Sequence, residues 1–367
     1  MITDVIIMAG GFGERLWPAS SPTHPKQFMA LNDNISFLQE SLIRALALKI
    51  SGKIVVVTRK DIENECTLQI KKLAERSEEA DARKLLAESI VLAEPAPKHT
   101  SAAIMLGVNL INKLEPDSSH TFLVLTSDHV ISPVDQFAKD CKNAAAAAEN
   151  GKFVCFAIAP TQAATGYGYI KAGKDLTGEK HTFKIENFKE KPDEKTAKEY
   201  FESGNYFWNS GMFAFEGKMF LNEMLSCTPK VSNAFEAVTK GKKPSLKQVN
   251  GVYVIKSWPE MEITYQDVPS IAVDKAIAEK SENAAVVKAT FKWTDVGSWD
   301  TFSELCTNPM NNKVVQVECE NNFVYSDIPV SLCGVKDLII VAKNGKLLVM
   351  KKGESSLVRS AVKAIEQ

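Results

Sequence analysis

The residues of this sequence that first indicate chemistry are glycines and cations that follow a short apolar run. The run, residues 5–9, is succeeded by Gly10, Gly11, Gly13, Arg15 and Lys26. Glycine lets backbone N–H groups approach an anion closely. An arginine and a lysine add ionic hydrogen bonds worth roughly 1.5–3 kcal/mol each. The pattern predicts a loop that binds phosphate, and a tight turn with two solvated cations explains the glycines alone equally well.

The spacing of the glycines excludes two better-known phosphate loops. A dinucleotide-binding fingerprint that started at Gly11 would need a glycine where the chain has Leu16. A P-loop would need Gly-Lys followed by Ser or Thr, and the sequence has no such triplet. A nicotinamide-dependent dehydrogenase therefore does not fit the glycine pattern, although it would fit an α/β sheet.

Two aspartates are candidates for binding a metal ion. Asp128 follows the apolar run 121–125, and Asp295 lies in Trp-Thr-Asp-Val-Gly-Ser-Trp. Open α/β sheets bind ligands at the carboxyl ends of their strands, where both residues are expected. Either aspartate alone would more often cap a helix or a turn. As a pair they form an incomplete Mg²⁺ shell, with Mn²⁺ as an alternative ion, that phosphate oxygens and water could complete.

Several segments together resemble one enzyme family. Gly-Gly-Phe-Gly-Glu-Arg-Leu-Trp-Pro followed by Pro-Lys-Gln-Phe is similar to the signature of sugar-1-phosphate nucleotidyltransferases, and the Leu-Trp-Pro form resembles their mannose-1-phosphate guanylyltransferase branch. Three later segments also match the family: 165–169 (Thr-Gly-Tyr-Gly-Tyr), 188–192 (Phe-Lys-Glu-Lys-Pro) and 208–212 (Trp-Asn-Ser-Gly-Met). The motifs occur in the family's order across residues 2–308.

The resemblance implies that GTP and α-D-mannose 1-phosphate are converted into GDP-mannose and pyrophosphate. It also implies roles for individual residues. The residues that it makes catalytic are Arg15, Lys26 and Lys191, and those that it makes nucleotide-binding are Gly10, Gly11, Gly13, Glu94, Thr100 and Ser127. The residues expected to bind the sugar phosphate are Gly168, Glu190, Lys191 and Asn209, and those expected to bind the metal ion are Asp128 and Asp295. No general base is needed, because a sugar phosphate with a second pKa of about 6 is already ionised at neutral pH. His129 is therefore interpreted as structural.

Two segments depart from the family pattern and leave alternatives open. Lys98-His99 stands where the family has Arg-Asn, in a segment that the resemblance places against the base and ribose. A related nucleotidyltransferase with another base or hexose therefore remains possible. The family's Ser-Ile-Asp appears as Ser-Ile-Ala-Val-Asp at 270–274, which leaves open whether Asp274 is the counterpart. A non-catalytic binder of nucleotide sugars would be expected to lose the metal carboxylates or Lys26.

Composition limits the partners of the chain. Its 367 residues carry a net charge of −1, so nothing favours a nucleic-acid or membrane surface. The chain shows no export signal and no apolar run of membrane-spanning length. Its seven cysteines are an odd number without a Cys-x-x-Cys pair, which predicts buried or free thiols in the cytoplasm. The sequence leaves the oligomeric state open, a homodimer being one option.

Alternating strands and helices must position these residues. The apolar patterns predict strands at 5–9, 53–58, 89–93, 121–125 and 153–159. They predict helices at 36–48, 61–86 and 134–149, and a further helix that begins after Thr100, with Thr100 as its N-cap. This alternation predicts an α/β fold with a Rossmann-like, open, mixed but mainly parallel sheet flanked by helices. Further strands are predicted at 167–172, 183–188, 208–215 and 284–291. We expect a catalytic domain over 1–308 and a small β-rich domain over 309–367, with a hairpin at Asn344-Gly345, a closing helix 355–365 and no internal repeat.

Overall fold

The computed structural model describes residues 1–11, 13–176, 178, 181–309 and 313–366. Phe12 of the glycine loop and residues 310–312 after the predicted domain boundary lie outside these ranges. The chain forms two compact units. We call Met1–Gly10, Ser41–Thr126 and Ile131–Trp293 the sheet unit, and Gly11–Glu40, Ser127–Val130 and Thr294–Gln367 the tail unit. The boundary at 308 remains a prediction, because neither unit is one continuous stretch of chain.

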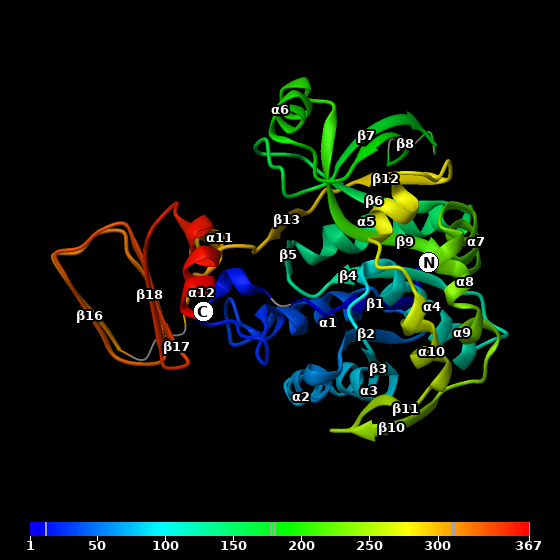
Figure 1. The fold of residues 1–367 in the computed structure, drawn as a ribbon, viewed down its shortest axis with the longest axis horizontal. Helices are drawn as coiled ribbons and strands as arrows, with labels where there is room; N and C mark the ends of the chain where they lie inside the picture. Colours follow the sequence, from blue (N-terminus) through cyan, green and yellow to red (C-terminus); the bar gives the residue numbers. More distant parts are fainter. Residues whose placement is uncertain (12, 177, 179–180, 310–312, 367) are drawn as a thin grey trace. The chain divides into compact units, whose positions relative to one another are not determined.

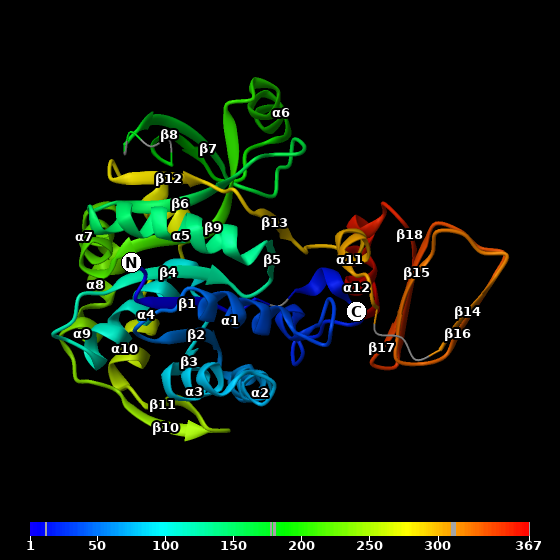
Figure 2. The same cartoon turned by 180° about the vertical axis from the view of Figure 1, so that it is seen from behind.

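Eleven described strands form one mixed sheet in the sheet unit, in the order β10-β11-β3-β2-β1-β4-β9-β6-β12-β8-β7 (Figures 1 and 2). Their bounds are β1 Asp4–Met8, β2 Ile54–Arg59, β3 Ser89–Glu94, β4 Thr121–Thr126, β6 Phe153–Ile158, β7 Tyr169–Asp175, β8 Thr182–Lys189, β9 Tyr206–Glu216, β10 Ser245–Val249, β11 Val252–Ser257 and β12 Ala284–Lys288. Strands β11, β3, β2, β1 and β4 are parallel. Strand β9 runs antiparallel between β4 and β6. The two-stranded pair β5 (His129–Ser132) and β13 (Lys292–Asp295) is separate.

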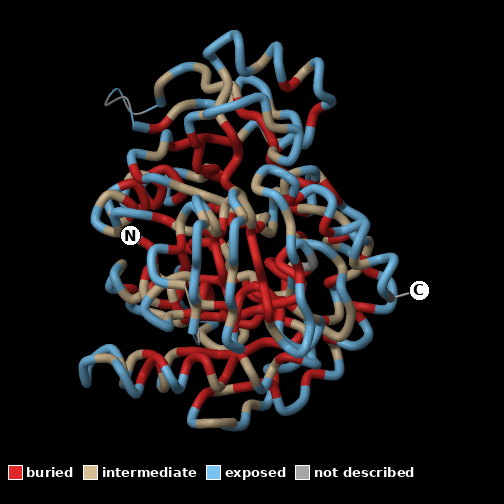
Figure 3. The backbone as a smooth tube through the Cα atoms, turned by 90° about the vertical axis from the view of Figure 1, so that its left-hand side faces the viewer, coloured by how far each residue is buried: buried red, intermediate tan, exposed pale blue. Residues whose placement is uncertain are grey.

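Helices cover both faces of this sheet (Figures 1 and 2). They are α1 Phe37–Ala47, α2 Glu63–Ala74, α3 Glu79–Glu88, α4 His99–Leu114, α5 Val134–Glu149, α6 Glu194–Ser203, α7 Gly217–Cys227, α8 Pro229–Ala234, α9 Glu236–Lys240 and α10 Pro259–Asp267. Residues 101–111 of α4 are all buried, and the central strands are buried with them (Figure 3). The α/β fold class predicted from the alternation is confirmed. No described helix has the length and apolar character needed to cross a membrane.

Helix α4 begins differently from the prediction, because Thr100 is not its N-cap. The helix starts at His99, and its N-cap residue Lys98 makes no side-chain capping bond. The backbone N–H of Ser101, in the first turn of the helix, instead donates to the carbonyl of Ile271 at 3.2 Å. The Thr100 hydroxyl accepts from the N–H of Val273 at 2.9 Å. A distant loop therefore satisfies the helix start, which a local capping rule cannot anticipate.

The tail unit combines the N-terminal loop with the end of the chain. Its elements are α11 Trp299–Leu305, β14 Val314–Val317, β15 Phe323–Ser326, β16 Val330–Cys333, β17 Leu338–Lys343, β18 Lys346–Lys351 and α12 Val358–Glu366. Strand β14 pairs in parallel with β16, and β15 with β17, with a constant offset of 16 residues (Val314 with Val330, Phe323 with Ile339). Neither β16 nor this repeating offset was expected from the sequence. The predicted hairpin is confirmed: Asn344 and Gly345, both with positive φ, connect β17 and β18.

The tail unit has its own hydrophobic core, which draws on three segments of chain. Leu16, Trp17 and Phe37 of the N-terminal segment pack with Trp299 and Phe302 of α11 and with residues of β15, β17, β18 and α12. The indole N–H of Trp299 donates to the carbonyl of Trp17 at 2.8 Å. The two tryptophans of the family-like motifs therefore hold the glycine loop against the segment that carries Asp295.

Candidate active site

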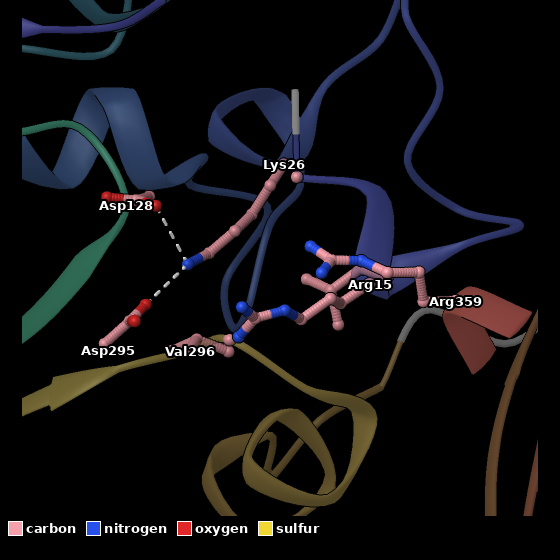
Figure 4. A pocket seen from close by; sticks show the side chains of 9 residues that line it. Arg15, Lys26, Asp128, Asp295, Val296 and Arg359 are labelled. Carbon is pink, nitrogen blue, oxygen red and sulfur yellow. Dashed lines mark hydrogen bonds and ion pairs between the residues drawn. The ribbon is translucent and has the colours of Figure 1, made fainter. Parts of the chain in front are cut away.

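The tail unit brings three of the predicted residues into direct contact. The Lys26 Nζ atom lies 3.0 Å from Asp128 Oδ2 and 3.1 Å from Asp295 Oδ1 (Figure 4). Lys26 opens a short 3-10 turn after Pro25, Asp128 lies between β4 and β5, and Asp295 ends β13. The Lys26 side chain is 5% exposed, whereas those of Asp128 and Asp295 are 37% and 28% exposed. The two carboxylates therefore share one buried cation and still reach the solvent.

The charges of this cluster support one another. Burial lowers the pKa of Lys26, but the charges of Asp128 and Asp295 outweigh it, so its pKa lies above the ordinary value. Desolvation raises the pKa of Asp128, but the charges of Lys26 and His129 outweigh it, so its pKa lies below the ordinary value. His129 Nε2 lies 3.9 Å from Asp128 Oδ1. His129 therefore lies beside the cluster and lowers the pKa of Asp128 when its ring is protonated.

Gly13 is needed where the loop passes Lys26. Its φ is +65°, and a Cβ placed there would lie 2.4 Å from the Cβ of Lys26. No side chain fits at that distance, so the glycine allows the loop and the lysine to lie in contact. Gly11, by contrast, has no heavy atom within 4 Å of such a Cβ.

A cavity of about 380 Å³ opens onto this cluster. Arg15, Arg359, Gly13 and Gly297 line it together with Lys26, Asp128 and Asp295. The side chains of Arg15 and Arg359 both extend into the cavity toward the lysine and the two aspartates (Figure 4). Arg359 was not predicted from the sequence, because this residue lies on α12, far from every motif. Three cations with two carboxylates suit a polyphosphate that carries a divalent ion.

The donor set fits a divalent ion only in part. The described residues hold no group of three or more His, Cys, Asp or Glu side chains that could bind a metal ion. Asp128 and Asp295 nevertheless meet at one atom, Lys26 Nζ, and Mg²⁺ is commonly held by one or two carboxylates with phosphate and water oxygens. The residues therefore fit an ion that arrives with a phosphorylated substrate.

A second cluster of predicted residues lies in the sheet unit. The Asn209 side-chain amide donates to Asp274 Oδ1 at 2.6 Å, and its backbone N–H donates to the carbonyl of Gly168 at 2.7 Å. A Cβ at Gly168 would lie 2.6 Å from Glu190 Oε2. Lys191 Nζ lies 3.6 Å from Glu190 Oε1 and is largely exposed. Asp274, which the sequence left open, thus belongs to this cluster.

The carboxylates of the second cluster resist ionisation. Desolvation, reinforced by the charge of Asp274, raises the pKa of Glu190. Desolvation also raises the pKa of Asp274, although its bond from Asn209 opposes the effect. The backbone N–H of Glu190 donates to Glu279 Oε1 at 3.0 Å, a contact that no motif predicted. Acceptors of this kind beside an exposed lysine suit a ligand with hydroxyl groups and a phosphate.

The predicted base-binding segment begins at Glu94, the last residue of β3. Its Oε1 accepts from the Tyr265 hydroxyl at 2.6 Å, and a Cβ at Gly10 would lie 3.9 Å from its Oε2. Desolvation raises the pKa of Glu94 to about 7, in spite of the bond from Tyr265. Tyr265 was missed, because α10 lies in a stretch without a motif.

The structure divides the predicted residues between the two units. The sheet unit holds Gly10, Glu94, Thr100, Gly168, Glu190, Lys191 and Asn209. The tail unit holds Gly11, Gly13, Arg15, Lys26, Ser127, Asp128 and Asp295. Ser127 is buried beside Asp128 in the chain, and Gly11 is exposed.

The α/β fold and the cavity suited to a polyphosphate are typical of enzymes that act on nucleotides. Comparison with known proteins identifies the family. Residues 4–311 match the family described as nucleotidyl transferase, and residues 312–365 match the domain described as a MannoseP isomerase/GMP-like beta-helix. The chain therefore belongs to the nucleotidyl transferase family.

Curated relatives are similar over nearly the whole chain. The mannose-1-phosphate guanylyltransferase RfbM of Salmonella typhimurium is 34% identical over 97% of this chain and 71% of its own. The mannose-1-phosphate guanylyltransferase of Escherichia coli is 33% identical over 99% of this chain and 72% of its own. Among solved structures, one titled mannose-1-phosphate geranyltransferase, from Thermus thermophilus, has a TM-score of 0.78 and 29% identity, with full coverage of both chains. These similarities agree with the family that the motifs indicated.

Proposed function

We propose that this protein is a mannose-1-phosphate guanylyltransferase, which converts GTP and α-D-mannose 1-phosphate into GDP-mannose and pyrophosphate. The observation that carries the proposal is the buried Lys26 between Asp128 and Asp295, beside Arg15 and Arg359. The curated relatives named for this activity supply the substrates. A cytoplasmic location fits the proposal, since all seven cysteines are free thiols.

In the proposed reaction, a phosphate oxygen of the sugar phosphate attacks the α-phosphorus of GTP. A new P–O bond forms as the bond between the α-phosphorus and its bridging oxygen breaks, and pyrophosphate leaves with the electron pair. Arg15 and Lys26 hold the triphosphate and stabilise the charge of the leaving pyrophosphate. The chain supplies mainly positioning and charge, because neither nucleophile nor leaving group needs a proton transfer at neutral pH.

The remaining predicted residues receive roles in the same scheme. Gly10, Gly11 and Gly13 bring backbone N–H groups to the phosphates, and Glu94, Thr100 and Ser127 border the nucleoside. Gly168, Glu190 and Asn209 hold the hexose, and Lys191 holds its phosphate. Asp128 and Asp295 would hold Mg²⁺ or Mn²⁺, which neutralises phosphate charge when bound. The domain division at 308 belongs to this proposal as well.

The base and the hexose are the part of the proposal to test first, because Lys98-His99 departs from the family pattern. The test is pyrophosphate release by the purified protein with Mg²⁺, with GTP, ATP, UTP and dTTP each combined with mannose, glucose and N-acetylglucosamine 1-phosphate. We expect turnover with GTP and mannose 1-phosphate. Activity confined to UTP or dTTP with glucose 1-phosphate would replace the guanylyl assignment by the related activity.

Asp295→Asn tests the metal-binding role directly. It keeps the shape of the side chain but removes the charge, so we expect turnover to fall at least about tenfold, equivalent to about 1.4 kcal/mol of barrier, with the fold intact by circular dichroism. Asp33→Asn is the matched control, because Asp33 is an exposed residue of the same unit. Equal turnover in both variants would remove Asp295 from the site.

A further inference from the structure

A second cavity, of about 510 Å³, lies in the tail unit and has no role in the proposed reaction. It is bounded by residues 17–24 of the N-terminal segment, by Asn344 and Lys346 of the β17–β18 hairpin, and by α12. Its volume falls in the range of small-molecule sites, about 300–1,000 Å³. The cavity is thus large enough for a ligand of nucleotide or sugar-phosphate size.

The wall formed by residues 17 and 18 is held firmly in place. Trp17 is 9% exposed and belongs to the tail-unit core. Its carbonyl accepts from the Trp299 indole at 2.8 Å, and the carbonyl of Pro18 accepts from the Asn344 side chain at 3.0 Å. The cavity is therefore bordered by anchored structure and not only by mobile surface side chains.

The charge of the lining has one sign. Lys346, Arg359 and Lys363 are cationic, and the described residues that line the cavity include no Asp or Glu. Lys346 Nζ lies 5.8 Å from the centre of the Trp17 ring. The hydroxyl groups of Ser20, Ser21 and Thr23 already form hydrogen bonds within the chain, and Pro18, Pro22 and Val362 add apolar surface. Cations beside an indole and prolines suit a phosphate attached to a ring.

We propose that this cavity is a second binding site, for a phosphorylated ring compound, in which Lys346, Arg359 and Lys363 hold the phosphate and the wall around Trp17 receives the ring. A nucleoside phosphate and a hexose phosphate share this chemistry. Arg359 lines both cavities, so a ligand that engages it here changes the charge available to the first cavity. The site is thereby linked to the candidate active site through one guanidinium group.

The test is protection of individual lysines from an amine-acylating reagent, followed by mass spectrometry of the full-length protein. The probes are GMP, mannose 6-phosphate and inorganic phosphate, with guanosine and mannose as uncharged counterparts. With GMP or mannose 6-phosphate at about ten times its dissociation constant, acylation of Lys346 and Lys363 should slow about tenfold, because about one tenth of the sites stay free. Lys351, at the far end of β18, is the internal control and should react at an unchanged rate.

A variant pair makes the test specific. Lys346→Ala should raise the concentration of ligand that half-protects Lys363 about fivefold, a typical upper value for one exposed ion pair, whereas Lys351→Ala should leave it unchanged. In wild type, the protecting ligand should also raise the KM for GTP, and Lys346→Ala should weaken that effect. Turnover without the ligand should be the same in both variants.

Three results would overturn this proposal. They are unchanged acylation with every probe, equal protection by inorganic phosphate, and protection that appears without ligand as the protein concentration rises, which would mean that a second copy covers the cavity. Acylation does not depend on turnover, so its failure leaves the proposed function standing. Likewise, absence of pyrophosphate release would leave the protection result standing.

Discussion

At the scale of the residue, Gly13 and Lys26 depend on each other. Alanine at position 13 would have to keep the positive φ of Gly13, which costs roughly 1–2 kcal/mol by itself, and its methyl group would also meet the Lys26 side chain. We expect Gly13→Ala to lower the melting temperature by several degrees and to reduce pyrophosphate release, because Lys26 is displaced from Asp128 and Asp295. Thermal unfolding and the release assay measure the two effects.

Gly11→Ala is the matched control for this prediction. It adds the same methyl group two residues earlier, where no heavy atom lies within 4 Å of the added carbon. Its melting temperature should stay close to that of wild type, whatever its effect on nucleotide binding. Equal loss of stability in the two variants would mean that the contact with Lys26 is not the cause.

His120 connects the stability of the sheet unit to pH. Its Nδ1 lies 2.8 Å from Asp4 Oδ2, and its Nε2 lies 3.1 Å from the carbonyl of Glu115. Both partners are acceptors, so the ring satisfies both as an imidazolium. The hydrogen bond with Asp4 raises the pKa of His120 above its ordinary 6.5, against the effect of burial. Folding therefore favours the proton, and the stabilisation is complete below pH 6.5 and is lost as pH rises through the folded pKa.

We therefore expect His120→Gln to destabilise the protein more at pH 6 than at pH 9. At pH 6 the loss should be about 1–3 kcal/mol, since Asp4 is fully buried and loses its charged partner. Urea unfolding at both pH values measures the difference, and His181→Gln, an exposed histidine of the same unit, is the control. A loss that is the same at both pH values would rule out the imidazolium.

The sequence predicted those site residues that follow apolar strands or lie in family-like motifs. Lys26, Asp128 and Asp295 converge in the structure because strand ends and loops bring them to one place. Arg359 was out of reach, since an exposed arginine on an amphipathic helix looks the same whether it faces solvent or a cavity. Tyr265 was missed for a related reason, because its hydrogen bond to Glu94 joins residues far apart in the chain.

At the scale of the element, the start of α4 and the loop before Asp274 hold each other. Thr100 accepts from the N–H of Val273, and the next residue, Asp274, accepts from Asn209. We predict that Thr100→Val loosens this loop at a cost of about 1 kcal/mol, the net value of one hydrogen bond. The KM for mannose 1-phosphate should rise about fivefold, with a smaller change for GTP.

Thr264→Val provides the comparison for that measurement. Thr264 is buried in the same unit, and its hydroxyl has no hydrogen-bond partner among the described residues, so the replacement removes no bond. Its KM values should match those of wild type. A change confined to the KM for GTP in Thr100→Val would instead assign Thr100 a direct contact with the nucleotide, as the resemblance implies.

Elements with strong local patterns were predictable, and elements defined by distant partners were not. The apolar runs of β1 to β4 and the helix 134–149 stand out in the sequence and occur as expected. Strand β16 has only four residues, Val-Ser-Leu-Cys, and none of them is fully buried, so its alternation is too short to stand out in the sequence. The 16-residue offset between β14 and β16 relates one segment of the chain to a single following segment. One such pair is too little to produce a repeat that is visible in the sequence.

At the scale of the whole molecule, the described hydrophobic cluster around α4 and the core of the tail unit share no residue, yet the chain passes between the units repeatedly. The segment that carries Lys26 belongs to the same core as the C-terminal strands. The candidate phosphate site therefore depends on residues beyond 308, although the family-like motifs all precede that position. A motif search locates the chemistry but does not show which part of the chain supports it.

Truncation after residue 308 tests this dependence. The fragment 1–308 lacks the side chains of β15, β17, β18 and α12 that pack on Trp17, Trp299 and Phe302, whereas the described hydrophobic cluster around α4 in the sheet unit contains no residue beyond 308. We expect hydrogen exchange to remain slow in β1 to β4 and to become fast in residues 14–29 and 294–305. Because Lys26 would lose its fixed position, turnover should fall about a hundredfold or more, the typical effect of a displacement of about 1 Å in an active site. If the fragment instead keeps both its protection in residues 14–29 and its turnover, residues 1–308 are a self-sufficient catalytic domain, as the sequence predicts, and the C-terminal strands serve another purpose.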